Sequence, residues 1–238
     1  MLLEVCVDTM EGAWAAVRGG AGRIELCSAL SEGGLTPSAG LMRAAAKLPV
    51  PVYAMIRPRA GHFRFSEAEE EIMASDIKLA KDFGLSGVVL GAQHGDHTLD
   101  RDMLARLSDR AAGLGRTLHR VIDVVPDPFA ALETAIDLGF ERVLTSGGQA
   151  TANAGQAVIR EMAATADFRI GIMPGAGLRP DLVANIIQST GVTEVHASCS
   201  VIVIDEDADG LFCPPGGCRK TSEDLVKQMV AAIGNSGC

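Results

Sequence analysis

Aromatic residues are scarce in this sequence: one Trp, one Tyr and seven Phe make up 4% of its 238 residues. Hydrophobic residues still make up 47% of the chain, so a core of ordinary size must be built from Ala, Val, Ile, Leu and Met. Positive charge is also in deficit, with a formal net charge of -9. An acidic chain gains no counterion-release affinity from phosphate backbones, which argues against nucleic acid and anionic membrane surfaces as partners.

Long apolar runs and paired cysteine motifs are missing as well. No run approaches the ~18 apolar residues of a membrane span, and "MLLEVCVDTM" at the N-terminus has neither a basic stretch nor a cleavage site. We therefore expect a cytoplasmic protein without a membrane partner, in which thiols stay reduced. No C-x-x-C occurs, and the sequence assigns no role to the last three of the six cysteines. They are Cys6, Cys27, Cys199, Cys213, Cys218 and Cys238.

Eight short β-rich runs recur along the chain, each followed by a helical pattern. This alternation predicts a parallel sheet covered by helices, and eight such units predict a single (β/α)8 TIM barrel over residues 1–238. A doubly wound open sheet is the alternative, but the first turn, "VDTMEGAW", lacks the G-x-G-x-x-G of such folds. The expected strands are 2–7, 23–27, 52–57, 87–91, 117–123, 142–147, 170–175 and 194–198.

Helix starts can be read from capping residues. Ser66 and Glu69 predict a capping box, and Thr36 followed by Pro37 predicts a second helix start. Residues 199–221 contain "DEDADG" and "CPPGGC" and follow neither the strand nor the helix pattern. We expect an irregular loop there, before the last helix.

Ionisable residues occupy alternate positions of several strands, and side chains alternate between the two faces of a strand. The aliphatic face must meet the helices, so the polar face points into the barrel. In "TLHRVID", this places His119 and Asp123 together at the carboxyl end, where barrel enzymes keep their active sites. The polar face of the last strand adds Ser198. The other inward residues are Glu4, Cys6, Glu25, Cys27, Arg57 and His196.

Such an interior has a structural and a functional interpretation. Each ionisable group costs several kcal/mol if it is buried without a partner. An ion-pair network of Arg57 with Glu25 or Asp123 that only supports the barrel is the structural alternative. Arg120 has the opposite parity. It could belong to the site, or it could bind carboxylates of the helix layer.

Two kinds of loop could hold an anion. In "IRPRAGHF", Arg57 and Arg59 flank a proline and could present guanidinium groups to a carboxylate or phosphate, or form a surface ion pair. The glycines of "LTSGGQ" and "MPGAGL" could expose backbone N–H groups to an anion. Glycines serve ordinary turns equally well.

Cys6 and Cys27 lie on adjacent inner faces if the first two strands are neighbours. Two thiolates beside an imidazole suit a soft ion such as Cu(I), or Zn(II). Cysteine is also a common small buried residue, which is the structural alternative for both positions.

Several separate stretches resemble, in order and spacing, the CutC family of copper homeostasis proteins. They are "EVCVDTMEGAWAAVRGGAGRIELCSALSEGGLTPS", "IRPRAGHFRFSEAEEEIMASDI", "TLHRVID", "LTSGG" and "VHAS". The resemblance runs from residue 4 to about residue 198. It implies a (β/α)8 barrel and cytoplasmic copper handling, with monovalent copper as the ligand. The resemblance is also compatible with a homo-oligomer. The pocket positions that it implies are Glu4, Cys6, Glu25, Cys27, Arg57, His119, Arg120, Asp123 and His196.

Two functions follow, and whether the chain is an enzyme stays open. The resemblance implies a copper homeostasis protein that binds Cu(I) at the carboxyl end of the barrel through Cys6, Cys27 and His119, with His196 as an alternative third ligand. The residue chemistry suggests instead an enzyme acting on a small carboxylate or phosphate.

In the enzyme alternative, His119 held by Asp123 would be the acid–base group, with Glu25 or Glu4 as its counterpart. No strand ends on a lysine, so a Schiff-base route is not expected. The anion would be held by Arg57, Arg59, Arg120, His196 and Ser198.

Overall fold

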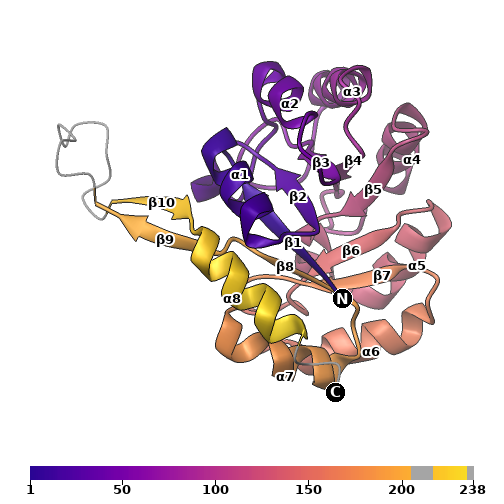
Figure 1. The fold of residues 1–238 in the computed structure, drawn as a ribbon. Helices are drawn as coiled ribbons and strands as arrows, with labels where there is room; N and C mark the ends of the chain where they lie inside the picture. The colour runs from indigo at the N-terminus through magenta and orange to yellow at the C-terminus, as the bar shows by residue number, and fades with distance from the viewer. Residues whose placement is uncertain (205–216, 235–238) are drawn as a thin grey trace.

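The computed structural model describes residues 1–204 and 217–234. Eight parallel strands alternate with helices and form a nearly closed barrel (Figure 1), which confirms the (β/α)8 prediction. The ladder order is β7-β6-β5-β4-β3-β2-β1-β8, and among the described residues no ladder joins β7 to β8. The strands are β1 Leu2–Val7, β2 Arg23–Leu26, β3 Val52–Met55, β4 Gly87–Leu90, β5 Gly115–Leu118, β6 Arg142–Thr145, β7 Gly171–Pro174 and β8 Glu194–Ala197.

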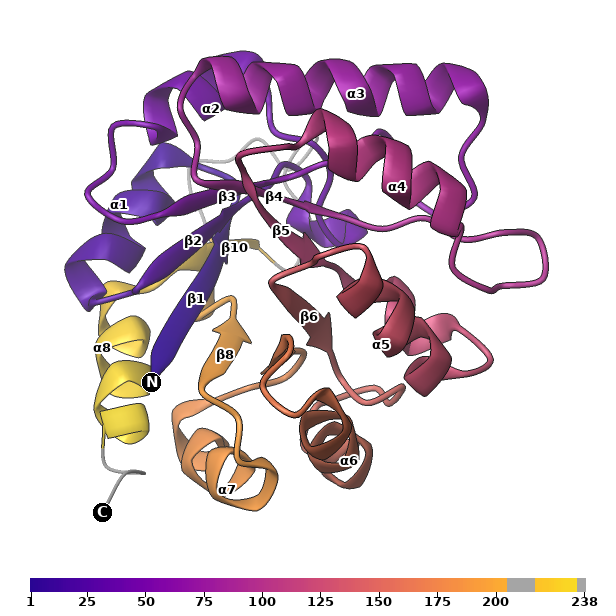
Figure 2. The same cartoon turned by 90° about the vertical axis from the view of Figure 1, so that its right-hand side faces the viewer.

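Helices surround the strands in a ring, seen along the barrel in Figure 2. Their buried faces pack on the aliphatic sides of the strands, so most of the apolar core lies between the strands and the helices. The helices are α1 Met10–Gly19, α2 Ala39–Ala45, α3 Glu67–Asp82, α4 Arg101–Arg110, α5 Pro128–Asp137, α6 Gln156–Ala166, α7 Pro180–Thr190 and α8 Glu223–Gly234.

Capping chemistry predicted one helix start correctly and missed another. Ser66 and Glu69 form the expected capping box of α3. The predicted start at Thr36 is wrong, because Ser38 caps α2 by accepting a hydrogen bond from the backbone N–H of Leu41. The Thr36 hydroxyl instead accepts a hydrogen bond from the backbone N–H of Arg57 and so ties the loop after β2 to the end of β3.

The predicted strand 117–123 is also wrong over most of its length. β5 ends at Leu118, and a 3-10 helix, η2, follows over Arg120–Val124. The imidazole of His119 caps this helix by accepting a hydrogen bond from the Val121 N–H. This capping turns the chain at the mouth of the barrel, so His119 and Asp123 do not lie on alternate positions of one strand.

Inside the barrel, one large ring takes most of the room. Tyr53 packs with Cys27, Met55 and Val89 in a small apolar cluster separate from the outer core. Gly87 and Gly115 face this ring, and a Cβ on either glycine would overlap the Tyr53 side chain. The two glycines on β4 and β5 therefore make room for the only tyrosine in the sequence.

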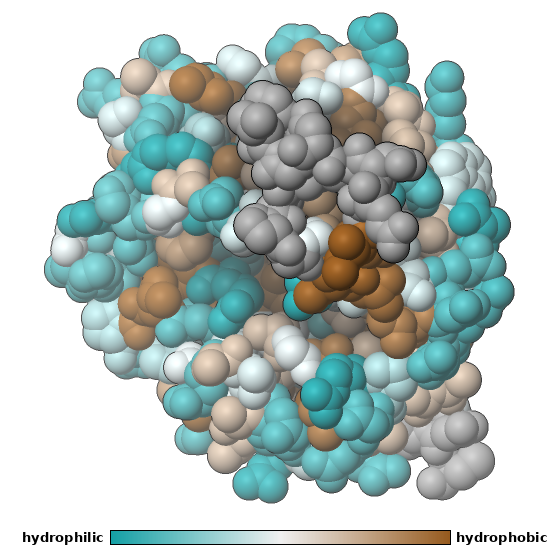
Figure 3. Space-filling view, turned by 90° about the vertical axis from the view of Figure 1, so that its left-hand side faces the viewer, coloured by the Kyte–Doolittle hydropathy of each residue, from teal (hydrophilic) through white to brown (hydrophobic). Residues whose placement is uncertain are grey.

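The predicted irregular loop 199–221 is regular at both ends. β9 (Ser200–Val203) and β10 (Cys218–Thr221) pair antiparallel and project from the carboxyl end of the barrel (Figure 1). Figure 3 views this end, where hydrophobic surface forms several patches on a mostly hydrophilic face, with a prominent one near its centre. Cys213 and Cys238 lie outside the described residues, whereas Cys218 is exposed on β10. None of the helices in 1–204 and 217–234 is long and apolar enough to cross a membrane.

The fit between Tyr53 and Gly87 predicts a specific stability loss. Gly87→Ala should lower the free energy of unfolding by about 1–3 kcal/mol, because the added methyl group overpacks the barrel interior. In a Tyr53→Leu background the same change should cost less. Gly95→Ala is the control, since no atom lies within 4 Å of a Cβ at that position. Urea denaturation measures all four variants, and equal losses in the two backgrounds would contradict the predicted clash.

Candidate functional site

A layer of charged side chains closes the amino-end half of the barrel. We call it the polar floor: Glu4, Arg23, Tyr53, Arg142 and Glu194. The guanidinium of Arg23 donates to the carboxylates of Glu4 and Glu194, and both Arg23 and Glu4 are buried. The guanidinium carbons of Arg23 and Arg142 lie 5.4 Å and 4.9 Å from the Tyr53 ring centroid. The floor is therefore a satisfied ion-pair network. The sequence suggested such a supporting network for Arg57, whereas the structure forms it around Arg23.

Glu4 links this floor to the site above it. One of its oxygens lies 2.8 Å from Nδ1 of His196. Burial opposes ionisation of Glu4, but the hydrogen bond to His196 and the charge of Arg23 outweigh it and lower the pKa to about 2. The carboxylate therefore stays ionised and holds Nδ1–H of His196, so that Nε2 is left to face the mouth.

Nε2 of His196 faces two further potential ligands. It lies 3.8 Å from an oxygen of Glu25, and the ligand atoms of Cys6, Glu25 and His196 all lie within 4.8 Å of one another. All three residues are buried. Burial would lower the pKa of His196, but the charges of Glu25 and Cys6 outweigh it and raise the pKa well above the usual value. A cation between these groups would replace that proton.

Cys27 lies beside this group but is not part of it. Its thiol is 3.6 Å from the Glu25 carboxylate and packs in the apolar cluster around Tyr53. Burial and the charge of Glu25 raise the pKa of Cys27 well above its ordinary range, so it is a thiol at neutral pH. Burial also raises the pKa of Glu25, as does the nearby Glu4 carboxylate.

Arg57 is buried without a carboxylate partner. Its guanidinium donates to the backbone carbonyls of Glu32, Gly34 and Gly61, and its Nε–H has no acceptor. Among the described residues no carboxylate oxygen lies within 4.0 Å of it, so the predicted alternative of an Arg57 ion pair with Glu25 or Asp123 is not formed. Burial lowers the pKa of Arg57, and the charge of Arg59 adds to this.

The predicted pairing of Asp123 with His119 is wrong. Asp123 accepts hydrogen bonds from Arg120, from the hydroxyls of Thr145 and Ser146, and from the backbone N–H groups of Ser146 and Gly148. The glycine loop after β6 thus binds the protein's own carboxylate in place of an external anion. Arg120 pairs with Asp123 and Ser146, not with the helix layer.

His119 nevertheless reaches the same space as Cys6. Burial and the nearby Arg57 charge lower its pKa to about 3, so the imidazole is neutral. It lines a cavity of about 190 Å³ together with Cys6, Glu25, Arg57 and His196, which we call the inner cavity.

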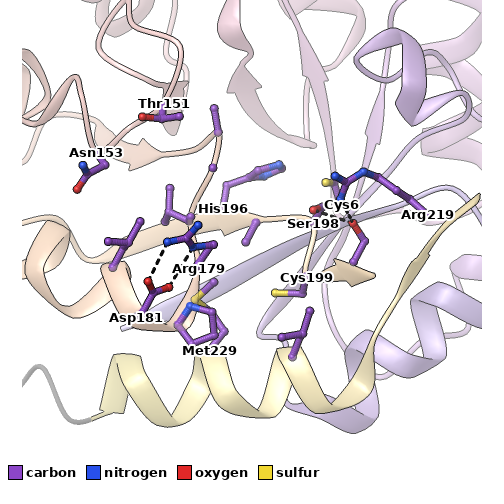
Figure 4. Close-up of a pocket in the computed structure, with 18 of the residues that line it drawn as sticks. Cys6, Thr151, Asn153, Arg179, Asp181, His196, Ser198, Cys199, Arg219 and Met229 are labelled. Carbon is purple, nitrogen blue, oxygen red and sulfur yellow. Dashed lines mark hydrogen bonds and ion pairs between the residues drawn. The ribbon is translucent and has the colours of Figure 1, made fainter. Parts of the chain in front are cut away.

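A second cavity of about 800 Å³, the outer cavity, opens beyond the first (Figure 4). Cys6, Arg120 and His196 line both, so the two adjoin. Ser198 and Cys199 line only the outer cavity, and Cys199 is a buried thiol that the strand pattern did not assign to the site. Arg59 lines neither, because it pairs with Glu69.

Comparison with known proteins places this architecture in a family. A model of the CutC family matches residues 1–201. The chain belongs to the CutC family. A family protein CutC of Agrobacterium fabrum (strain C58 / ATCC 33970) is 54% identical over 232 residues, which cover 96% of this chain and 92% of that protein. The copper homeostasis protein cutC homolog of Homo sapiens is 47% identical over 198 residues, which cover 83% and 72% of the two chains.

Solved structures agree with this assignment. A CutC crystal structure from Streptococcus agalactiae has a TM-score of 0.80 at 30% identity, covering 83% of this chain and 98% of that one. Thiamine phosphate pyrophosphorylase from Pyrococcus furiosus has a TM-score of 0.63 at 12% identity, covering 100% and 97%. The second likeness shows the barrel fold alone. The CutC resemblance predicted from the sequence motifs is confirmed.

The polar floor predicts that this CutC-family chain depends strongly on Arg23. Arg23→Met should lower the free energy of unfolding by about 3–5 kcal/mol, because it leaves the Glu4 carboxylate buried without its cation. Arg18→Met is the control. Arg18 pairs with Glu223 on the surface, where an ion pair contributes about 0–1 kcal/mol. Chemical denaturation compares the two, and losses of similar size would refute the structural role of the floor.

The depressed pKa of His119 predicts how acid affects stability. The unfolded chain takes up a proton near pH 6.5, and the folded His119 does so only near pH 3. The unfolded state therefore binds more protons in this window, and His119 should reduce stability by up to about 2 kcal/mol between pH 6.5 and 5.

His119→Gln removes this titration, so its stability should fall less over the same pH range than that of the parent. Phe63→Leu, a change of a neighbouring side chain that does not titrate, is the control for altered packing around the imidazole. Parallel curves for the parent and His119→Gln would contradict the buried, neutral imidazole.

Proposed function

We propose that this chain binds Cu(I) as the cargo of a copper homeostasis function, with Cys6 and His196 as the main ligands. The observation that carries the proposal is the group of Cys6, Glu25 and His196, whose ligand atoms lie within 4.8 Å of one another in a buried site. The names of the mouse and human relatives, which are copper homeostasis proteins, point to the same ion.

The donors fit a metal in geometry as well as in type. Nε2 of His196 and the Glu25 oxygen are 3.8 Å apart, and a metal between them could approach each at about 2.0–2.1 Å, the usual length of a first-row metal–nitrogen bond. Glu4 on Nδ1 orients the ring, as carboxylates do for metal-binding histidines. Thiolate and imidazole are ligands that suit the soft ion Cu(I). The Glu25 carboxylate is a hard ligand and contributes mainly its negative charge.

The predicted ligand set was Cys6, Cys27 and His119, and the geometry favours a different one around Cys6. Cys27 lies against Glu25, a member of that group. His119 lines the inner cavity but is not among the ligand atoms that lie together around Cys6. We therefore propose His196 in place of His119, with Cys27 as an additional thiolate that binding would have to deprotonate.

Thiol ligands of this kind need a reducing compartment, so the cytoplasmic location expected from the sequence belongs to the same proposal. The alternative of a barrel enzyme loses its His119–Asp123 acid–base pair, which the structure does not form. Its anion-binding half keeps support from Arg57, a buried cation without a carboxylate partner among the described residues.

An anaerobic Cu(I) titration against a competing chelator tests the copper site. Cys213→Ala and Cys238→Ala changes in every variant remove two thiols outside the described residues. One equivalent of Cu(I) should bind tightly to this background, and the Cys6→Ala, Cys27→Ala double variant should lose that binding. His196→Ala should weaken it by about 10–100-fold or more.

Two controls assign the ligands. Cys218→Ala, on the exposed hairpin, should leave the affinity unchanged. His119→Ala should weaken Cu(I) binding far less than His196→Ala, and the reverse order would restore the set predicted from the sequence. Unaltered affinity in the double cysteine variant would rule out a copper site in the barrel.

A further inference from the structure

Three residues that line the inner cavity each have a buried polar atom without a hydrogen-bond partner. The atoms are Nε of Arg57, Nε2 of His119 and Oε1 of Glu25. The three residues are only 6%, 3% and 3% exposed. A buried donor or acceptor without a partner costs about 1–3 kcal/mol. Three of them on one cavity of about 190 Å³ indicate a ligand that supplies the missing partners.

The hydrogen-bond partners of His119 define which of its nitrogens is a donor. Nδ1 accepts a hydrogen bond from the Val121 N–H at 3.1 Å, so Nδ1 carries no proton. The ring is neutral, and its single proton therefore lies on Nε2. Nε2–H is therefore a buried donor without an acceptor on a residue that lines the cavity.

Arg57 adds a second such donor together with a full positive charge. Its other contacts are backbone carbonyls of Glu32, Gly34 and Gly61, which accept hydrogen bonds but do not neutralise the cation. A buried ion without a counter-charge costs several kcal/mol. A negatively charged ligand would remove that cost.

Phe63 lines the same cavity and packs against both donor residues. Its ring centroid lies 4.6 Å from the His119 ring centroid and 5.0 Å from the guanidinium carbon of Arg57. The cavity volume of about 190 Å³ leaves room for several water molecules. A molecule of a few heavy atoms therefore fits in it.

We propose that the inner cavity binds a small hydroxycarboxylate. Its carboxylate accepts hydrogen bonds from Nε–H of Arg57 and Nε2–H of His119, and its hydroxyl donates to Oε1 of Glu25. A phosphate ion fits less well, because its doubly charged form brings a second negative charge beside Glu25, where Arg57 supplies one positive charge. Copper is not required, since neither Arg57 nor His119 is a ligand in the copper proposal, although Glu25 is shared.

Calorimetric titration of the full chain, freed of metal by a chelator, tests the proposal with a matched pair of probes. Lactate, as both enantiomers, and propionate differ only in the hydroxyl group, and inorganic phosphate is the third probe. One enantiomer of lactate should bind one-to-one and at least about tenfold more tightly than propionate, because a site built for a hydroxyl rejects the analogue without it. Phosphate should bind more weakly than lactate.

Two substitutions at His119 locate the ligand in the cavity. His119→Asn keeps an acceptor for the Val121 N–H but has no atom where Nε2 was, so lactate binding should weaken about tenfold. His119→Gln can place an amide donor near that position and should retain more of the affinity. Arg57→Lys should weaken binding by at least as much as His119→Asn, and Arg219→Gln, in the outer cavity, should change nothing.

Several results would overturn the proposal. They are equal affinities for lactate and propionate, tighter binding of phosphate, no binding of any probe, or equal effects of His119→Asn and His119→Gln. If Arg57→Lys fails to fold, the ligand pair and the His119 pair still decide the outcome. No metal is present in this experiment, so its result is separate from that of the Cu(I) titration.

Discussion

The buried contact between Glu4 and Arg23 is the interaction on which the site depends. It places a fixed negative charge at the centre of the barrel and uses Arg23 to balance it. Because that charge is already compensated, Glu4 can hold His196 from below without itself taking up a proton. The orientation of the His196 imidazole, which lies beside both Cys6 and Glu25, is thus set by side chains that no ligand needs to touch.

Above the floor, the inner cavity is lined by groups of both signs. Arg57 and His119 offer hydrogen-bond donors without acceptors, and Glu25 offers an oxygen without a donor. Cys6 and His196 form one group with Glu25. The donors of Arg57 and His119 suit an anion and the group around Cys6 suits a cation, and Glu25 is shared by the two proposals.

Strand parity in the sequence predicted much of this site, because it rests on a simple alternation. Glu4, Cys6, Glu25, Arg57 and His196 all point inward as expected. The same parity could have identified Arg23, which lies two residues before Glu25. Its partner Glu194 is 171 residues away in the chain, and only the closure of the barrel brings the two together.

Where the prediction failed, a local hydrogen bond had overridden a periodic pattern. "TLHRVID" reads as a strand, but the His119 side chain caps a 3-10 helix and ends the strand early. Asp123 is then carried to the glycine loop after β6, which removes it from His119. The hydrophobic pattern could not reveal where the strand ends, because the same alternation is compatible with a strand and with a short helical turn at its end.

The ring of Tyr53, enclosed by Gly87 and Gly115 and backed by two arginines, also has a kinetic meaning. It fills the amino end of the barrel, so a ligand enters and leaves the inner cavity from the carboxyl end. There Cys6, Arg120 and His196 border both cavities. A molecule resting in the outer cavity therefore touches side chains that also border one held deeper, so the arrival of either alters the walls that the other meets.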